Sequence, residues 1–285
     1  MGLGCVEEVL KPTSLDEVLS LLQERGPSAG LLGGGVSLVR YAPSHITSLI
    51  DLSTLPLNYV KEEEGRVKIG AATTLREMLD HPLIAGYLNG VVVKMLRQVA
   101  SPLLRNLATI GGALVSADPW SDVITLFLAL GAHVAIYDGT TDTLPLAKLY
   151  PIRSRLGGAI LTELVLPVPL QNAAAAFCKF NRTGFDIAVL NCACQVQLHD
   201  DRCVGASVVV GGTPRLAASL PDAEEVLTGQ PLTSETIEQA TVAARDAAEV
   251  REDRRASAEY RKQLVYVGVR RCLQEIKGQL GGGDR

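Results

Sequence analysis

The chain has 285 residues, of which 47% are hydrophobic and 20% charged, and its formal net charge is −4. This composition is typical of a folded globular protein, and the length is enough for two or three packed units. The acidic balance and the lack of a basic block argue against a nucleic-acid binder. The longest apolar run, at 124–137, is too short for a membrane span, and acids stand where a signal peptide needs bases, so we expect a cytoplasmic protein.

The first part of the chain, residues 1–54, predicts a helix followed by two strand-like stretches. Ser14 and Glu17 form a capping box, apolar residues at helical spacing follow, and Gly26-Pro27 ends the helix. The chain returns through AGLLGGG and ends in HITSLIDLS, both of which read as strands. We expect these residues to form an N-terminal subdomain.

The second part, residues 55–172, mixes strands and helices. RVKIGAA predicts a strand, and a second capping box, from Thr74 to Glu77, opens a helix that Pro82 ends. Apolar spacing predicts two further helices, followed by a strand and a hairpin turn. These elements are expected at Val92–Val99, Val123–Leu130, His133–Tyr137 and Asp138-Gly139.

The third part, residues 173–285, predicts an antiparallel hairpin from strands at 187–198 and 204–210, followed by helices. These helices are expected at about 222–227, 234–248 and 256–279. No run of βαβ units is visible, so the fold class is α+β.

The Cys192-Ala-Cys194 sequence has two interpretations, half of a metal site or a strand. Apolar and polar residues alternate through VLNCACQVQL, which is typical of a half-buried strand with cysteine as a small hydrophobic residue. Zinc and iron–sulfur sites need about four ligands in recognisable spacings, and the chain has six cysteines without a CxxC. The pattern therefore favours the strand.

Two glycine-rich segments share one pattern: LLGGGVSLVRY at 31–41 and SPLLRNLATIGGALVSADPWSD at 101–122. Neither matches a P-loop or a dinucleotide-binding fingerprint. Such glycines can make tight turns, or they can clear side chains so that backbone N–H groups surround an anion such as a diphosphate. The residues alone leave both alternatives open.

Five motifs in order give the chain a resemblance to a known family. They are AGLLGGGVSL, SPLLRNLATIGG with SADPWSD, KFNRTGFDIAVLN, VVVGGTPR and RRASAEYRKQLV. Together they resemble the FAD-binding medium subunit of molybdenum hydroxylases, such as xanthine dehydrogenase and carbon monoxide dehydrogenase, over almost the whole chain. The resemblance implies a two-subdomain FAD-binding fold (PCMH type) followed by a C-terminal domain of a small antiparallel sheet with helices.

The resemblance also implies which residues bind FAD. The two segments around the diphosphate would be Gly33, Gly34, Gly35, Val36, Ser37 and Leu38, and then Thr109, Ile110, Gly111 and Gly112. Ser116 and Asp122 match positions that hydrogen-bond the phosphate and ribose, and Leu161 matches a position beside the flavin or adenine. Lys179 matches a lysine near the isoalloxazine ring, where a cation would favour the reduced flavin.

Some of these positions allow a purely structural interpretation. Asp122 could be a first-turn helix acid that complements the helix dipole, and Lys179 could be a solvated surface lysine. The family commonly has alanine, a polar residue and asparagine where this chain has Gly33, Val36 and Ala113. The missing side-chain hydrogen bond at Ala113 predicts weaker FAD binding than is usual.

The implied function is electron transfer within a larger enzyme. An FAD subunit of this type would take electrons from partner iron–sulfur clusters and pass them to NAD+ or another acceptor. The implied partners are a molybdopterin-binding large subunit and a two-iron iron–sulfur small subunit, assembled as a dimer of heterotrimers. No catalytic or metal-ligating residue is predicted, because the sequence shows no acid–base pair or ligand cluster. Two alternatives stay open: a stand-alone FAD-dependent oxidoreductase, and a non-catalytic interaction protein that has lost FAD.

Overall fold

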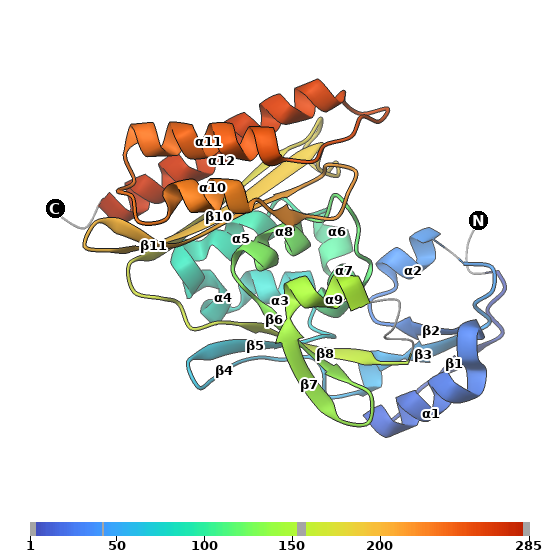
Figure 1. Cartoon of the computed structure of the whole chain (residues 1–285). Helices are drawn as coiled ribbons and strands as arrows, with labels where there is room; N and C mark the ends of the chain where they lie inside the picture. The colour runs from blue at the N-terminus through green and yellow to red at the C-terminus, as the bar shows by residue number, and fades with distance from the viewer. Residues whose placement is uncertain (1–3, 42, 153–157, 282–285) are drawn as a thin grey trace. The chain divides into compact units, whose positions relative to one another are not determined.

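A computed structural model describes residues 4–41, 43–152 and 158–281 of the chain (Figure 1). Its elements divide by contact into two compact units, each built from three stretches of chain. Unit 1 comprises Met1–Leu83, Ser101–Ser116 and Ala132–Pro167, and unit 2 comprises Ile84–Ala100, Ala117–Gly131 and Val168–Arg285. The domain boundaries that the sequence predicts after residues 54 and 172 stay a prediction.

Unit 1 begins with a small parallel sheet of order β1-β3-β2. Its elements are β1 (Glu8–Leu10), α1 (Leu15–Arg25), β2 (Ala29–Leu32), α2 (Val36–Tyr41) and β3 (Ser48–Asp51), with short 3-10 helices at Gly26–Ser28 and Leu52–Thr54. The predicted capping of α1 is confirmed, because Ser14 Oγ accepts the N–H of Glu17 at 3.2 Å. Val18 and Ile50 are fully buried between the helix and the sheet.

A five-stranded antiparallel sheet of order β4-β5-β8-β6-β7 completes the strands of unit 1. The strands are β4 (Val60–Glu63), β5 (Arg66–Gly70), β6 (His133–Tyr137), β7 (Thr141–Pro145) and β8 (Ile160–Leu166). The helices beside them are α3 (Leu75–Asp80), α6 (Pro102–Arg105), α7 (Ile110–Val115) and α9 (Leu146–Ile152). Thr74 and Glu77 make both bonds of the predicted capping box. The short helix α4 (Pro82–Gly86) follows α3.

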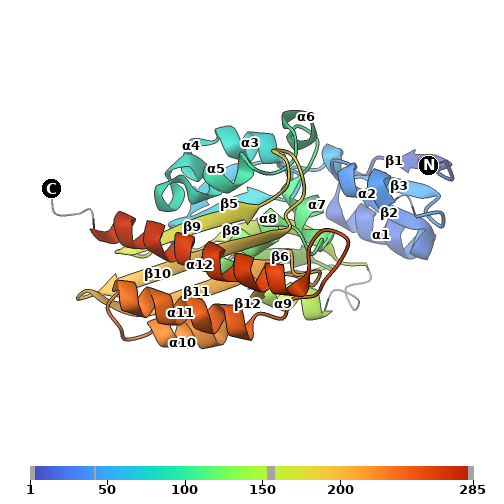
Figure 2. The ribbon, with the colours of Figure 1, turned by 90° about the horizontal axis from the view of Figure 1, so that it is seen from above.

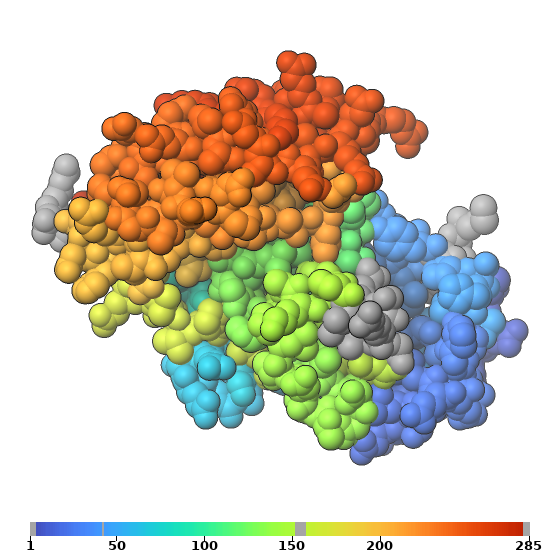
Figure 3. Space-filling model, in the orientation of Figure 1, coloured from blue at the N-terminus to red at the C-terminus, as the bar shows by residue number. Residues whose placement is uncertain are grey.

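Unit 2 is an antiparallel sheet of order β12-β11-β10-β9 with helices on both faces (Figure 2). Its strands are β9 (Ala173–Phe180), β10 (Leu190–His199), β11 (Arg202–Gly211) and β12 (Ala218–Ser219). One face carries α10 (Pro221–Leu227), α11 (Ser234–Ala247) and α12 (Ala258–Leu280), which form the orange-to-red layer of Figure 3. The other face carries α5 (Val91–Leu96), preceded by the 3-10 helix Tyr87–Gly90, and α8 (Asp122–Ala129).

Helices cover both faces of the sheet in unit 2, and this changes the prediction that β10 is half-buried. Cys192 and Cys194 lie in the hydrophobic core, as the strand interpretation predicts, and burial raises the pKa of the Cys192 thiol well above its usual range. The opposite face is not exposed, however, because Asn191 and Ala193 are also fully buried. The first five residues of the strand, Leu190–Cys194, are therefore buried on both faces, since α8 packs on the face that the alternation predicted to be exposed to water.

The α+β class is confirmed, although several observed elements were not predicted. The first 51 residues hold a parallel sheet, α6 and α7 occupy the segment before α8, and Lys179 lies within β9, a strand that the sequence analysis did not predict. These helices span only four to six residues, too few for an apolar period to appear in the sequence. Among the described residues, no helix combines the length and apolarity needed to cross a membrane.

Candidate functional site

The first glycine segment joins β2 to α2 and leaves backbone donors without acceptors. Gly35 adopts a φ of +73°, a left-handed conformation that glycine takes without strain. The first intrahelical bond of α2 runs from Val39 N to Gly35 O at 2.8 Å. Within the described part of the chain, the N–H groups of Val36, Ser37 and Leu38 have no hydrogen-bond acceptor.

The second glycine segment is different, because its backbone N–H groups are already hydrogen-bonded within the protein. The N–H of Ile110 donates to Thr73 O at 2.9 Å, and the N–H of Gly111 donates to Ala71 O at 2.9 Å. The N–H of Gly112 donates to Thr109 Oγ1 at 3.2 Å, which caps α7. The sequence predicts both segments as sources of N–H groups, whereas in the structure the first turn of α7 is satisfied by the protein itself.

The two segments pack directly on each other, which explains two of the glycines. A Cβ at Gly34 would overlap the carbonyl oxygen of Leu107, and a Cβ at Gly33 would lie 2.8 Å from Thr109 Oγ1. Gly111 is similarly enclosed, since its Cβ would lie 2.8 Å from Ala71 O. Close approach of the two segments therefore requires Gly33 and Gly34, and it sets the free donors of α2 beside the capped start of α7.

Thr109 connects the two segments, so its hydroxyl can be tested alone. Thr109→Val keeps the side-chain shape but removes the acceptor for Gly112 N–H, and it should lower the free energy of unfolding by about 1 kcal/mol. Urea unfolding of the purified chain measures this change. Thr109→Ser retains the capping oxygen and should lose less, and equal losses in both variants would show that capping is not the cause.

The remaining predicted residues of unit 1 lie in different settings. Ser116 ends α7 and donates its hydroxyl to Ala113 O at 3.1 Å. Leu161 lies in β8 opposite Ile136, and only 9% of it is exposed. The structure brings Gly33–Leu38 and Thr109–Gly112 together. The N–H of Ser116 donates to Gly112 O at 3.0 Å, and β8, which carries Leu161, contacts α7.

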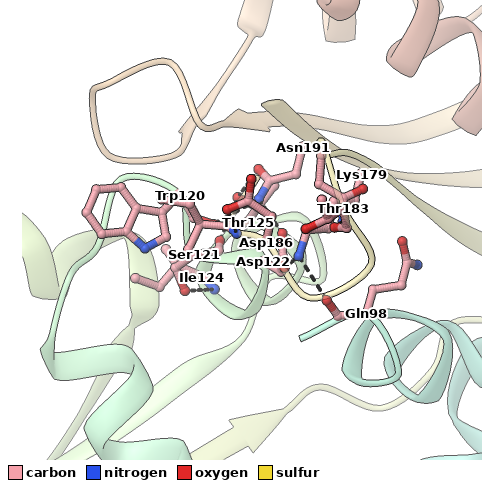
Figure 4. Close-up of polar contacts among 12 residues, drawn as sticks. Gln98, Trp120, Ser121, Asp122, Ile124, Thr125, Lys179, Thr183, Asp186 and Asn191 are labelled. Carbon is pink, nitrogen blue, oxygen red and sulfur yellow. Dashed lines mark hydrogen bonds and ion pairs between the residues drawn. The ribbon is translucent and has the colours of Figure 1, made fainter. Parts of the chain in front are cut away.

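In unit 2, Lys179 and Asp122 form a buried ion pair (Figure 4). Lys179 Nζ lies 2.7 Å from Asp122 Oδ2, with side chains 2% and 6% exposed. Lys179 also donates to Gln98 O at 2.8 Å. Lys179 is therefore not a solvated surface lysine, and its positive charge is balanced by a carboxylate in contact with it.

Two further buried polar residues complete this cluster. Asn191 Nδ2 donates to Asp122 Oδ1 at 2.7 Å, and Thr125 Oγ1 lies 2.8 Å from Asn191 Oδ1. A Cβ at Gly211 would overlap oxygens of both Thr125 and Asn191, so β11 needs a glycine here. We call Lys179, Asp122, Asn191 and Thr125 the Lys–Asp cluster. Its members come from β9, α8 and β10.

Burial and pairing have opposite effects on Asp122. Burial raises the pKa of the carboxyl, while the charge of Lys179 and the donors of Lys179 and Asn191 oppose this rise. Asn191 was not predicted as a site residue, although one sequence signal could have found it. Asn191 interrupts the run Ala188-Val189-Leu190 in a buried strand, where an amide needs internal partners.

Comparison with known protein families decides the identity of the fold. The family described as the FAD-binding domain in molybdopterin dehydrogenase matches residues 5–169, and the CO dehydrogenase flavoprotein C-terminal domain matches residues 175–276. The chain belongs to this FAD-binding subunit family. The family match confirms the predicted fold and identifies FAD as the cofactor of the subunit.

Individual relatives of this FAD-binding subunit cover nearly its full length. It is 30% identical to the nicotinate dehydrogenase FAD-subunit of Eubacterium barkeri over 97% of this chain and 98% of that one. It is 28% identical to the carbon monoxide dehydrogenase medium chain of Afipia carboxidovorans, over 94% and 96%. The solved carbon monoxide dehydrogenase of Hydrogenophaga pseudoflava superposes with a TM-score of 0.86 at 26% identity, over 94% and 96%. These relatives are oxidoreductase subunits, as predicted.

The donor set of unit 1 fits an FAD diphosphate. Backbone N–H groups bind phosphate oxygens well, and the start of α2 provides three of them without a competing acceptor in the described residues. Ser37 adds a hydroxyl for which the described part of the chain holds no hydrogen-bond partner. The described residues contain no group of three or more His, Cys, Asp or Glu side chains placed to hold a metal ion.

Proposed function

We propose that this chain is the FAD-binding electron-transfer subunit of a molybdenum hydroxylase. It would receive electrons from partner iron–sulfur clusters and deliver them to NAD+ or another acceptor in the cytoplasm. The free N–H groups at the start of α2, set against the second glycine segment, are the observation that carries this proposal. Bound FAD would supply the electron-carrying chemistry that the side chains of the chain lack.

The protein's role in this proposal is to bind and orient the cofactor. Val36, Ser37 and Leu38 would donate N–H groups to the diphosphate, with the Ser37 hydroxyl as a further donor. Gly34 would allow this loop to rest on Leu107, and Thr109–Gly112 would form the wall behind it. Contacts of Ser116, Asp122, Leu161 and Lys179 with FAD stay predictions from the resemblance.

The balanced charge of Lys179 changes its proposed role. A lone cation near the flavin would favour reduction strongly, but Asp122 lies 2.7 Å from the ammonium and cancels most of its field at a distance. We therefore propose that Lys179 and Asp122 act as a neutral pair that presents hydrogen-bonding groups, rather than as a free positive charge.

Partners follow from the relatives, several of which are named as medium chains or as subunits of dehydrogenase complexes. We propose a molybdopterin-binding large subunit and a two-iron iron–sulfur small subunit, assembled as a dimer of heterotrimers. The described residues hold no metal-binding cluster of their own, so the metal centres would lie in the partners.

Purification of the complex through a tag on this chain tests the assignment. The complex from the native host should contain FAD, iron and molybdenum in fixed ratios, and the chain expressed alone should bind FAD without oxidising small alcohols or amines. An active homo-oligomer with FAD but without iron or molybdenum would identify a stand-alone oxidoreductase instead. A chain that binds no FAD, alone or in the complex, would favour the interaction protein.

A further inference from the structure

The helix α12 begins with a buried arginine whose role the proposed function does not explain. Arg261 lies in the motif RRASAEYRKQLV, and its side chain is 2% exposed. Its guanidinium pairs with Asp253 Oδ1 at 2.7 Å through Nη2, and Nη1 donates to Gly212 O. Burial of an arginine is costly unless its charge and donors are satisfied, so this position imposes a definite geometry on its partners.

Gly212 connects Arg261 to the turn before α8 through hydrogen bonds. It has a φ of +76°, and a Cβ there would lie 2.8 Å from Leu190 Cα, so only glycine fits. Its N–H donates to Pro119 O at 2.7 Å. Arg261 therefore donates to the carbonyl oxygen of Gly212, and the N–H of Gly212 donates to the carbonyl oxygen of Pro119. Pro119 lies three positions before Asp122.

The neighbouring Gly211 faces the Lys–Asp cluster itself. Its lack of a side chain leaves room for Asn191, which donates to Asp122 Oδ1, and for Thr125, which donates to Asn191 Oδ1. The VVVGGTPR segment thus contacts the cluster through one glycine and Arg261 through the next. A shift of this segment would displace Pro119, which lies in the turn before Asp122, and also Asn191, which donates to the Asp122 carboxylate.

Asp253 and Arg255 make a second connection to the same cluster. Asp253 Oδ1 accepts the N–H groups of Arg255 at 2.8 Å and Ala256 at 3.2 Å, which shapes the turn before α12. Arg255 Nη2 then reaches Asp186 Oδ2 at 2.6 Å and Ile187 O at 3.1 Å. Asp186 and Ile187 lie in the connection between β9, which carries Lys179, and β10, which carries Asn191.

We propose that Arg261 is a positioning residue for the Lys–Asp cluster, acting through Gly212 on the Pro119–Asp122 turn, with the partly exposed Asp253 as its counter-ion. This assigns a role to two motifs, VVVGGTPR and RRASAEYR, that no predicted cofactor contact uses. Its consequence for the cofactor rests on the proposed function, because it assumes that Asp122 faces bound FAD. The positioning itself does not depend on FAD.

Hydrogen exchange of the full-length, FAD-free chain tests the positioning first. Arg261→Met should speed exchange in peptides covering 117–125 and 210–214, and Arg261→Lys, which can keep the pair with Asp253, should restore part of the protection. Leu273→Ala is the matched control, because Leu273 is fully buried in the same helix and belongs to the core cluster instead. It should lower stability without selective exposure of these two peptides. If Arg261→Met does not fold, Asp253→Asn takes its place.

FAD affinity provides the second readout. Arg261→Met should weaken FAD binding about tenfold or more, as expected when a hydrogen bond to a charged group no longer holds the site, and Leu273→Ala should not. Unchanged exchange in 117–125, or an equal response to Leu273→Ala, would overturn the proposal. A wild-type chain that binds no FAD would overturn the proposed function instead, while the exchange result would still decide the role of Arg261.

Discussion

Gly34→Ala is expected to abolish stable FAD binding. The new Cβ would overlap the carbonyl oxygen of Leu107, and because this obstacle is backbone, one glycine segment must move away from the other. Overpacking of this kind lowers the free energy of unfolding by about 1–3 kcal/mol. The displaced loop would also carry the N–H groups of Val36, Ser37 and Leu38 out of position, so FAD affinity should fall by more than about tenfold.

Two glycine variants separate loop packing from contact with FAD. Gly86→Ala is the neutral control, because nothing lies within 4 Å of its added Cβ, and it should retain both stability and FAD. Gly112→Ala meets only Thr109 Oγ1, at 3.1 Å, at an exposed position in α7, so the fold should be kept. Loss of FAD from Gly112→Ala alone would indicate direct approach of the cofactor. Full FAD content in Gly34→Ala, measured by visible absorbance, would refute the role of the first segment.

The second large effect is expected from Lys179→Met. Removal of the ammonium leaves the carboxylate of Asp122 buried with Asn191 as its remaining side-chain donor in the described residues. Breaking a buried ion pair from one side costs about 3–5 kcal/mol, because one charge stays without compensation. Thermal and urea unfolding of the full chain should show this loss.

The double variant Lys179→Met/Asp122→Asn is the matched control for this pair. It removes both charges and retains an oxygen for Asn191, so it should recover much of the stability. If the cluster lies beside FAD, the single variant should also move the flavin midpoint potential to more negative values, and the double variant should reverse that shift. A single variant as stable as wild type would show that the pair is not energetically coupled.

The destabilisation of Lys179→Met should depend on pH. Loss of the cation removes the group that opposes burial, so the folded-state pKa of Asp122 rises further in the variant. A raised folded-state pKa gives stability that is present at low pH and lost as the pH rises through that pKa. The stability gap between wild type and variant should therefore narrow as the pH falls from neutral into the acid range, and a gap that widens would contradict the assignment to Asp122.

The two glycine segments could be recognised in the sequence, but the sequence did not show which of them has free backbone N–H groups. Helix α7 spans six residues and its N–H groups use carbonyls of Ala71 and Thr73, which are distant in sequence, so no local pattern reveals that its donors are satisfied. The first segment lies between β2 and α2, and the structure explains Gly34 by the close carbonyl of Leu107, while its contact with a phosphate stays a prediction. Long-range backbone contacts of this kind leave no periodic signal.

The Lys–Asp cluster shows the same limit for side chains. Lys179 was an open choice between a flavin-tuning cation and a surface lysine, and the structure shows instead a buried lysine paired with Asp122. The partner lies on α8, which the apolar spacing predicted well, and the strand of Asn191 was predicted as well. The types of these two elements could thus be read from local sequence, whereas the pairing of a charge on β9 with one on α8 depends on how those elements pack.

The interleaved course of the chain restricts how this protein can be cut and synthesised. The chain passes from one unit to the other five times, after residues 83, 100, 116, 131 and 167. A fragment that ends near residue 170, between the two family matches, would keep α5 and α8 but lose the strands β9, β10 and β11 that these helices contact. On the ribosome, α5 and α8 are synthesised before the strands β9–β11 that they contact, so their apolar residues stay uncovered until the C-terminal part of the chain is made. Early release of the nascent chain should therefore produce an aggregation-prone product.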